Sequence, residues 1–131
     1  MVTNTFEHDE VADWLVGFET DGVPAIETAL TTVNDMDKDD FIPESEAAFA
    51  LAAAELVAAA RDEDHSRLPK SIHAALEGHE DGINAAKLAP SARKAVTRIL
   101  KNSELRDAAH EEGEADEWEE DLADLLERLR G

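Results

Sequence analysis

Four acidic residues follow part of the spacing of a calcium-binding loop. They stand at loop positions 1, 3, 5 and 12 and are Asp35, Asp37, Asp39 and Glu46. Carboxylate oxygens are the ligands that calcium prefers, and an EF-hand loop lies between two helices, as this one would. The pattern departs from the motif at position 6, where Asp40 replaces glycine, and at position 9, which is Pro43. A specific calcium site, weak attraction of cations and an ordinary solvated loop therefore all stay open.

Glu55 is the one charged residue in an apolar, mostly alanine stretch, residues 47–60. A carboxylate buried among such neighbours must be paired or become protonated. The expected partner is a group on a neighbouring helix, with Arg93, Arg98 or the Trp14 indole as candidates. A functional acid in a pocket is the alternative.

Asp13, beside Trp14, is a second acid that is either paired within the structure or a functional acid. An Asp within a first helix most often caps or pairs locally. Asp13 and Glu55 together could supply the paired carboxylates of a small hydrolase, but no spacing in the sequence brings them together.

Other catalytic and metal-binding patterns are absent from the sequence. There is no cysteine, no H-E-x-x-H, no glycine-rich phosphate loop and no serine nucleophile motif. The histidines, which are expected at the surface or at helix ends, are His8, His65, His73, His79 and His110. No catalytic residue and no cofactor is assigned, and a non-enzymatic role is favoured.

The charge is the strongest global feature, with 32 acids against 12 Lys and Arg and a formal net charge of −20. Such a field repels nucleic acid and anionic lipid and attracts basic partners. Three interpretations compete: a solvated surface suited to a salty cytoplasm, a surface complementary to a basic protein, and a mimic of the DNA backbone. The expected partner is a basic protein, assembly with a second copy is left open, and no membrane or direct nucleic-acid binding is expected.

The basic residues gather on one predicted helix face, which carries Arg93, Lys94, Arg98 and Lys101. This face could bind an anion or a phosphate. In so acidic a chain, pairing with acids of the same molecule or of a second copy is the favoured interpretation.

Length and pattern indicate one all-α domain, residues 1–131, built as a compact bundle of about five to seven helices. The apolar run 47–60 is its buried central helix, because a helix that is apolar all round has no solvent face. Without a signal-like start or a membrane-length segment, a cytoplasmic location is expected. The expected helices span residues 6–19, 24–34, 44–62, 69–78, 90–101, 103–112 and 115–130, with an irregular stretch at 78–89.

Three segments together resemble a known family. They are FEHDEVADWL at residues 6–15, AAAELVAA at 52–59, and the helix from residue 92 that ends in NSEL at 102–105. Their order and content are similar to those of DUF4259, a bacterial domain of unknown function. One departure is the family's Gly-Thr-Trp-Gly-like head, in whose place residues 1–5 read MVTNT. The resemblance implies a helical fold and carries no established activity.

Overall fold

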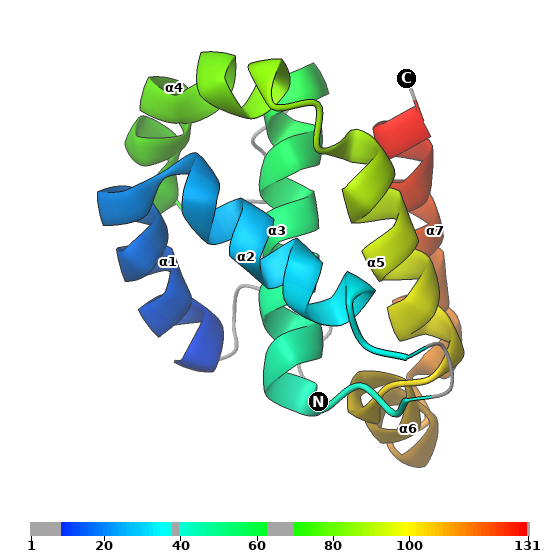
Figure 1. Ribbon diagram of the computed structural model, residues 1–131. Coiled ribbons are helices and arrows are strands. Elements are labelled where there is room, and N and C mark those ends of the chain that lie inside the picture. Colours follow the sequence, from blue (N-terminus) through cyan, green and yellow to red (C-terminus); the bar gives the residue numbers. More distant parts are fainter. Residues whose placement is uncertain (1–8, 38–39, 63–69, 131) are drawn as a thin grey trace.

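The computed structural model describes residues 9–37, 40–62 and 70–130. In these ranges the chain forms seven helices and no strand (Figure 1). Their bounds are α1 Asp9–Asp21, α2 Val23–Asn34, α3 Glu44–Asp62, α4 Lys70–Ala85, α5 Ala89–Lys101, α6 Glu104–Glu111 and α7 Ala115–Arg130. The predicted all-α bundle is confirmed.

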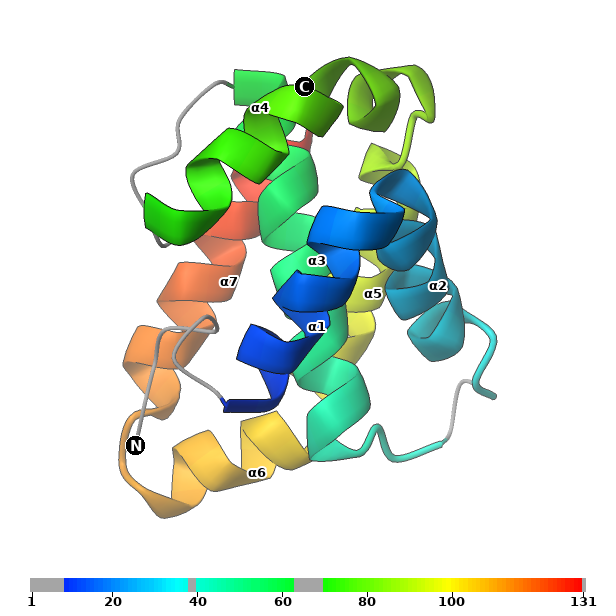
Figure 2. The same cartoon turned by 90° about the vertical axis from the view of Figure 1, so that its left-hand side faces the viewer.

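Helix α3 runs through the centre of the bundle and contacts all six other helices (Figures 1 and 2). Its residues 50–60 are all buried, and most of them are alanine. Small side chains let neighbouring backbones approach closely, while Leu51, Leu56 and Val57 fill the space between them. The charges at the helix ends suit its dipole, with Glu44 and Glu46 in the first turn and Arg61 in the last.

The surrounding helices each present an apolar stripe to this centre. Their largest fully buried side chains are Phe18, Ile26, Leu30, Leu76, Ile83, Ile99, Leu125 and Leu129. These stripes follow the helical spacing of the sequence, which is why the existence and type of most helices were predictable. None of the described helices combines the length and the apolarity needed to cross a membrane.

Helix α4 is longer than the sequence analysis predicts. It continues through Gly78 to Ala85, so an end at Gly78 and an irregular stretch from 78 to 89 are both wrong. Gly78 and Gly82 both lie inside this helix, and each costs about 1 kcal/mol relative to alanine. Burial of Ile83 contributes roughly 1.5–3 kcal/mol and offsets that cost. The Asn84 amide also donates to the Ala60 carbonyl at 3.0 Å, which ties the end of α4 to α3.

The turn between α1 and α2 depends on Gly22 and on a histidine expected at the surface. Gly22 has φ +70°, which favours glycine, and a Cβ there would lie 2.8 Å from Cε1 of His79. The His79 ring also meets Phe18 edge-on at a centroid distance of 5.3 Å. His79 is therefore a packing residue that joins α4 to this turn, while His8 and His65 lie outside the described residues.

Helix α6 is fixed at its start by Ser103. The Ser103 hydroxyl accepts from the Arg106 backbone N–H at 3.1 Å and so caps the helix. Ile42 bridges to the same point, since its N–H donates to the Asn102 carbonyl and its own carbonyl accepts from Glu104. The segment before α3 is thereby held against the α5–α6 junction.

We expect an enlarged alanine in α3 to destabilise the bundle. Ala53 is fully buried, so Ala53→Leu should lower the free energy of unfolding by about 1–3 kcal/mol through overpacking. The same change at Ala123, which is exposed on α7, should alter it by less than about 0.5 kcal/mol. Urea denaturation of both variants measures this, and equal effects would contradict a close-packed α3.

Candidate functional site

Glu55 forms a buried ion pair with Arg128, near the end of α7. Arg128 Nη1 donates to Glu55 Oε2 at 3.1 Å, and the side chains are only 12% and 5% exposed. The prediction that Glu55 is buried and paired across helices is therefore confirmed. The suggested partners, Arg93, Arg98 and the Trp14 indole, are replaced by Arg128. That residue is 73 positions away in the sequence and is brought close by the packing of α7 on α3.

Asp13 and Trp14 belong to a different part of the molecule. Asp13 is exposed on α1, whereas Trp14 is half-buried and stacks on Phe18 with ring centroids 6.2 Å apart. Among the described residues α1 makes no contact with α7, the helix that holds the Glu55 carboxylate. The structure therefore does not assemble Asp13 and Glu55 into paired carboxylates.

The candidate calcium ligands are distributed over two helix ends. Asp35 is the C-cap of α2, and the Asp37 N–H donates to the Asp40 carboxylate at 3.1 Å. Glu46 stands in the first turn of α3, where it lines a small cavity together with Trp14. Asp39 lies outside the described residues. Within the described ranges no three His, Asp or Glu residues are grouped to hold a metal ion, and a cation site at residues 35–46 stays a prediction.

Arg98 has a structural role at the end of α2. Its guanidinium donates to the carbonyls of Val33 and Asp37, the latter at 2.6 Å. These are carbonyls at and just beyond the C-terminal end of a helix, where a cation is favoured. The favoured pairing with acids is thus corrected for Arg98, whose guanidinium donates to backbone oxygens rather than to carboxylates.

The acids concentrate on α6 and α7. Residues 104–127 hold 12 acids, and Arg106 is the sole Lys or Arg among them. We call the exposed members of this set the acidic face: Glu104, Asp107, Glu111, Glu112, Asp116, Glu117, Glu119, Glu120, Asp124 and Glu127.

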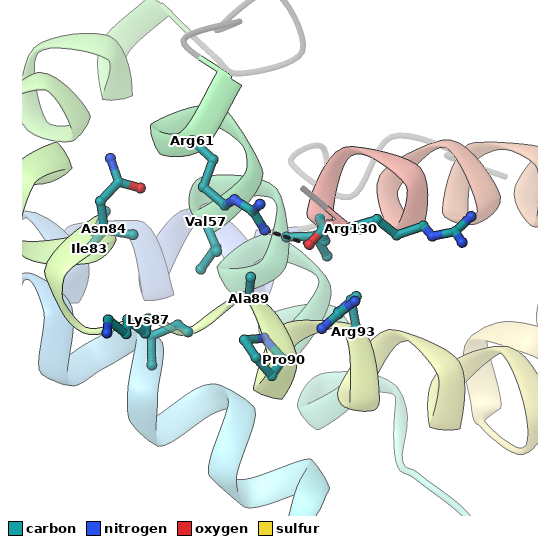
Figure 3. A pocket seen from close by; sticks show the side chains of 11 residues that line it. Val57, Arg61, Ile83, Asn84, Lys87, Ala89, Pro90, Arg93 and Arg130 are labelled. Atoms are coloured by element: carbon teal, nitrogen blue, oxygen red, sulfur yellow. Dashed lines mark hydrogen bonds between the residues drawn. The ribbon is translucent and has the colours of Figure 1, made fainter.

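Basic residues concentrate elsewhere, around a cavity of about 270 Å³ where α3, α4, α5 and α7 meet (Figure 3). We call it the basic pocket, after its four cationic lining residues Arg61, Lys87, Arg93 and Arg130. Figure 3 shows Arg61 reaching from α3 to the end of α7, with Arg93 on α5 nearby, while Lys87 points away from both and Arg130 extends outward along α7. None of the described residues that line it is Asp or Glu.

The sequence analysis missed this pocket because three of its cations come from segments far apart. Arg61 and Arg130 stand at the ends of the helices expected at 44–62 and 115–130, and Lys87 lies in the stretch expected to be irregular. Only Arg93 belonged to the basic cluster on the predicted helix. The remaining members of that cluster, Lys94, Arg98 and Lys101, line a second cavity on the other side of the α2–α5 contact, which also includes Asp40.

We expect removal of one partner of the Glu55–Arg128 pair to lower the free energy of unfolding more than replacement of both partners by apolar residues. Glu55→Ala should lower the free energy of unfolding by about 3 kcal/mol, because it leaves the Arg128 charge buried without this partner. Glu55→Gln should lose less, since the amide keeps the shape and can still accept a hydrogen bond. Thermal and urea denaturation measure both variants.

The exposed pair Glu127–Arg130, at 2.9 Å, is the matched control. Glu127→Ala should change the free energy of unfolding by less than about 0.5 kcal/mol. A double change of Glu55 and Arg128 to Leu and Met should recover much of the loss, because an apolar pair of similar volume removes both buried charges. Small and equal losses for Glu55→Ala and Glu127→Ala would contradict the buried pair.

Comparison with known families identifies the chain. The family model described as a domain of unknown function, DUF4259, matches residues 2–121. No curated protein and no solved structure matches the chain. Since the match covers residues 2–121 and therefore most of the sequence, including all three segments that suggested the resemblance, the protein belongs to the DUF4259 family.

Proposed function

We propose that the protein is a non-enzymatic binding module whose acidic face binds a basic protein. The observation that carries this proposal is the segregation of charge: 12 acids occupy residues 104–127, while described cations gather around α5. If the acids served only to keep the surface solvated, this separation of acids from cations would not be required. The proposal retains the cytoplasmic location expected from the sequence.

The orientation of α7 supports the proposal. Its apolar stripe of Trp118, Leu122, Leu125 and Leu129 is buried against the bundle. Most of the acids therefore project to the opposite side, on a helix of 16 residues that the stripe holds in place. A rigid row of carboxylates suits recognition, because its geometry is set before the partner arrives.

The acids of the acidic face repel one another, and binding of a basic partner would remove this repulsion. Asp116, Glu120 and Asp124 follow one another at four-residue spacing, and like charges at this spacing destabilise a helix by about 0.2–0.5 kcal/mol per pair. A basic segment laid along α7 would replace repulsion by attraction. Electrostatic attraction of this kind raises the association rate and weakens with salt.

A hydrolase function is less favoured than protein binding, because the two acids that it would use, Glu55 and Asp13, are not placed to act together. The Glu55 carboxylate is held by Arg128, and Glu55 as a whole is 4% exposed, which leaves a substrate little access to it. Asp13 stands exposed on α1, apart from the helix that engages Glu55.

Selective neutralisation of the acidic face tests the proposal. We expect the wild-type protein to retain a basic protein from the source lysate at low salt, after nuclease treatment, and to release it in a salt gradient. The triple variant Glu117→Gln, Glu119→Gln, Glu120→Gln should release the same protein at lower salt. Its affinity for the purified partner should fall roughly tenfold, since exposed charge contacts contribute about 0.2–1 kcal/mol each.

A control with the same charge change separates the acidic face from total charge. Glu19, Glu27 and Glu77 are exposed on α1, α2 and α4, and their triple change to Gln raises the net charge equally. This variant should bind as the wild type does. Equal weakening in both triples, or no retained basic protein, would contradict a defined binding surface on α6 and α7.

A further inference from the structure

The composition of the basic pocket is unusual for this chain. Acids outnumber Lys and Arg by 32 to 12, yet the described lining contains four cations and no acid. Like charges gathered around a cavity repel one another, and that repulsion is strongest where water is partly excluded. An anion in the cavity would remove it.

Two of the four cations have partners that explain their positions. Arg61 donates to the Leu129 carbonyl at 2.5 Å and so satisfies the C-terminal end of α7. Arg130 pairs with Glu127 at 2.9 Å on the exposed side of the same helix. These contacts use only part of each guanidinium, which has five N–H donors.

Lys87 and Arg93 have no such explanation. Within the described part of the chain, neither forms an ion pair with a carboxylate. Both flank the start of α5, where the helix dipole is positive and a cation is disfavoured. That start has no side-chain cap and no acid in its first turn, so its first N–H groups add to the positive field rather than being neutralised by the chain.

The floor of the cavity is apolar, and its accessible part belongs to the start of α5. Leu88, Ala89 and Pro90 line it and are at least partly exposed, whereas Val57, Ile83 and Leu129 behind them are buried by at least 99%. A volume of about 270 Å³ suits a small organic molecule rather than a bare ion. An apolar floor beneath a cationic rim favours a ligand that has both an oxyanion and a short apolar body.

We propose that the basic pocket binds a small organic anion, whose phosphate or carboxylate group contacts Arg61 and Arg93 and whose apolar part lies on Ala89 and Pro90. Guanidinium groups bind both oxyanions through paired N–H donors. This site lies around the start of α5 and meets the acidic face only at the end of α7, where Arg130 pairs with Glu127, and it selects ligands of the opposite charge. Failure of either proposal leaves the other standing.

An NMR titration of the isotopically labelled full chain tests this site, with three small molecules that share a benzene ring and differ in their charged or neutral group. Phenyl phosphate, benzoate and the neutral benzyl alcohol are added at roughly 150 mM salt, which screens diffuse attraction. We expect at least one of the two anions to bind at least tenfold more tightly than the alcohol and to shift the backbone amide signals of residues 83–93 first. A preference for phenyl phosphate assigns a phosphate ligand, and a preference for benzoate assigns a carboxylate.

Charge-removing variants locate the site. Lys87→Gln, Arg93→Gln should weaken binding of the preferred anion at least tenfold, whereas Arg106→Gln, which removes a cation from α6 outside the pocket, should leave it unchanged. Arg93 is only partly buried, so Arg93→Gln alone keeps the test valid if the double variant unfolds. The proposal is overturned if neither anion binds more tightly than benzyl alcohol, if the pocket variants bind as the wild type does, or if the shifts centre on Lys94 and Lys101.

Discussion

The structure depends on one packing constraint: a single helix, α3, must contact six others at once. A helix with large side chains all round would hold its neighbours too far apart for so many to share it. The buried alanines of residues 47–60 remove that obstacle, and most of the cohesion comes from the larger side chains that the outer helices supply. Glu55 is the exception in this apolar centre, and it requires Arg128. The pair joins α7 to α3, and together with the apolar stripe of α7 it orients the acidic face outward.

The arrangement of charge follows from the same constraint. With the core occupied by α3 and the inner stripes, most ionisable groups of the described residues lie at the surface, where acids exceed bases. The acids cover the outer side of α6 and α7, while the cations line cavities on either side of the α2–α5 contact. In a chain of net charge −20, cations scattered over the surface would be neutralised by nearby acids. Cations gathered in cavities instead stay available to bind a ligand. We infer that the protein works through these two surfaces and not through a reacting group in the core.

Much of the fold could be predicted from the sequence, and much less of the candidate sites. Helices α3 and α7 have the predicted bounds, since each has a strong apolar pattern with acids at its start and arginines at its end. The end of α4 was missed because Gly78 was given more weight than the burial of Ile83. The need of Glu55 for a partner follows from its apolar neighbours, but the choice of Arg128 follows from tertiary packing. The basic pocket likewise joins Arg61, Lys87 and Arg130, which no local pattern connects.

Native-state hydrogen exchange tests the central role of α3 most directly. Amides in the middle of α3 should exchange only through global unfolding, with a free energy equal to that from urea denaturation, because opening this helix breaks contact with every other helix. Amides of α6, a helix of eight residues at the end of the bundle, should exchange through smaller local openings. If α3 instead exchanges as readily as α6 while α5 and α7 stay protected, the bundle is not built around α3 and the account is wrong.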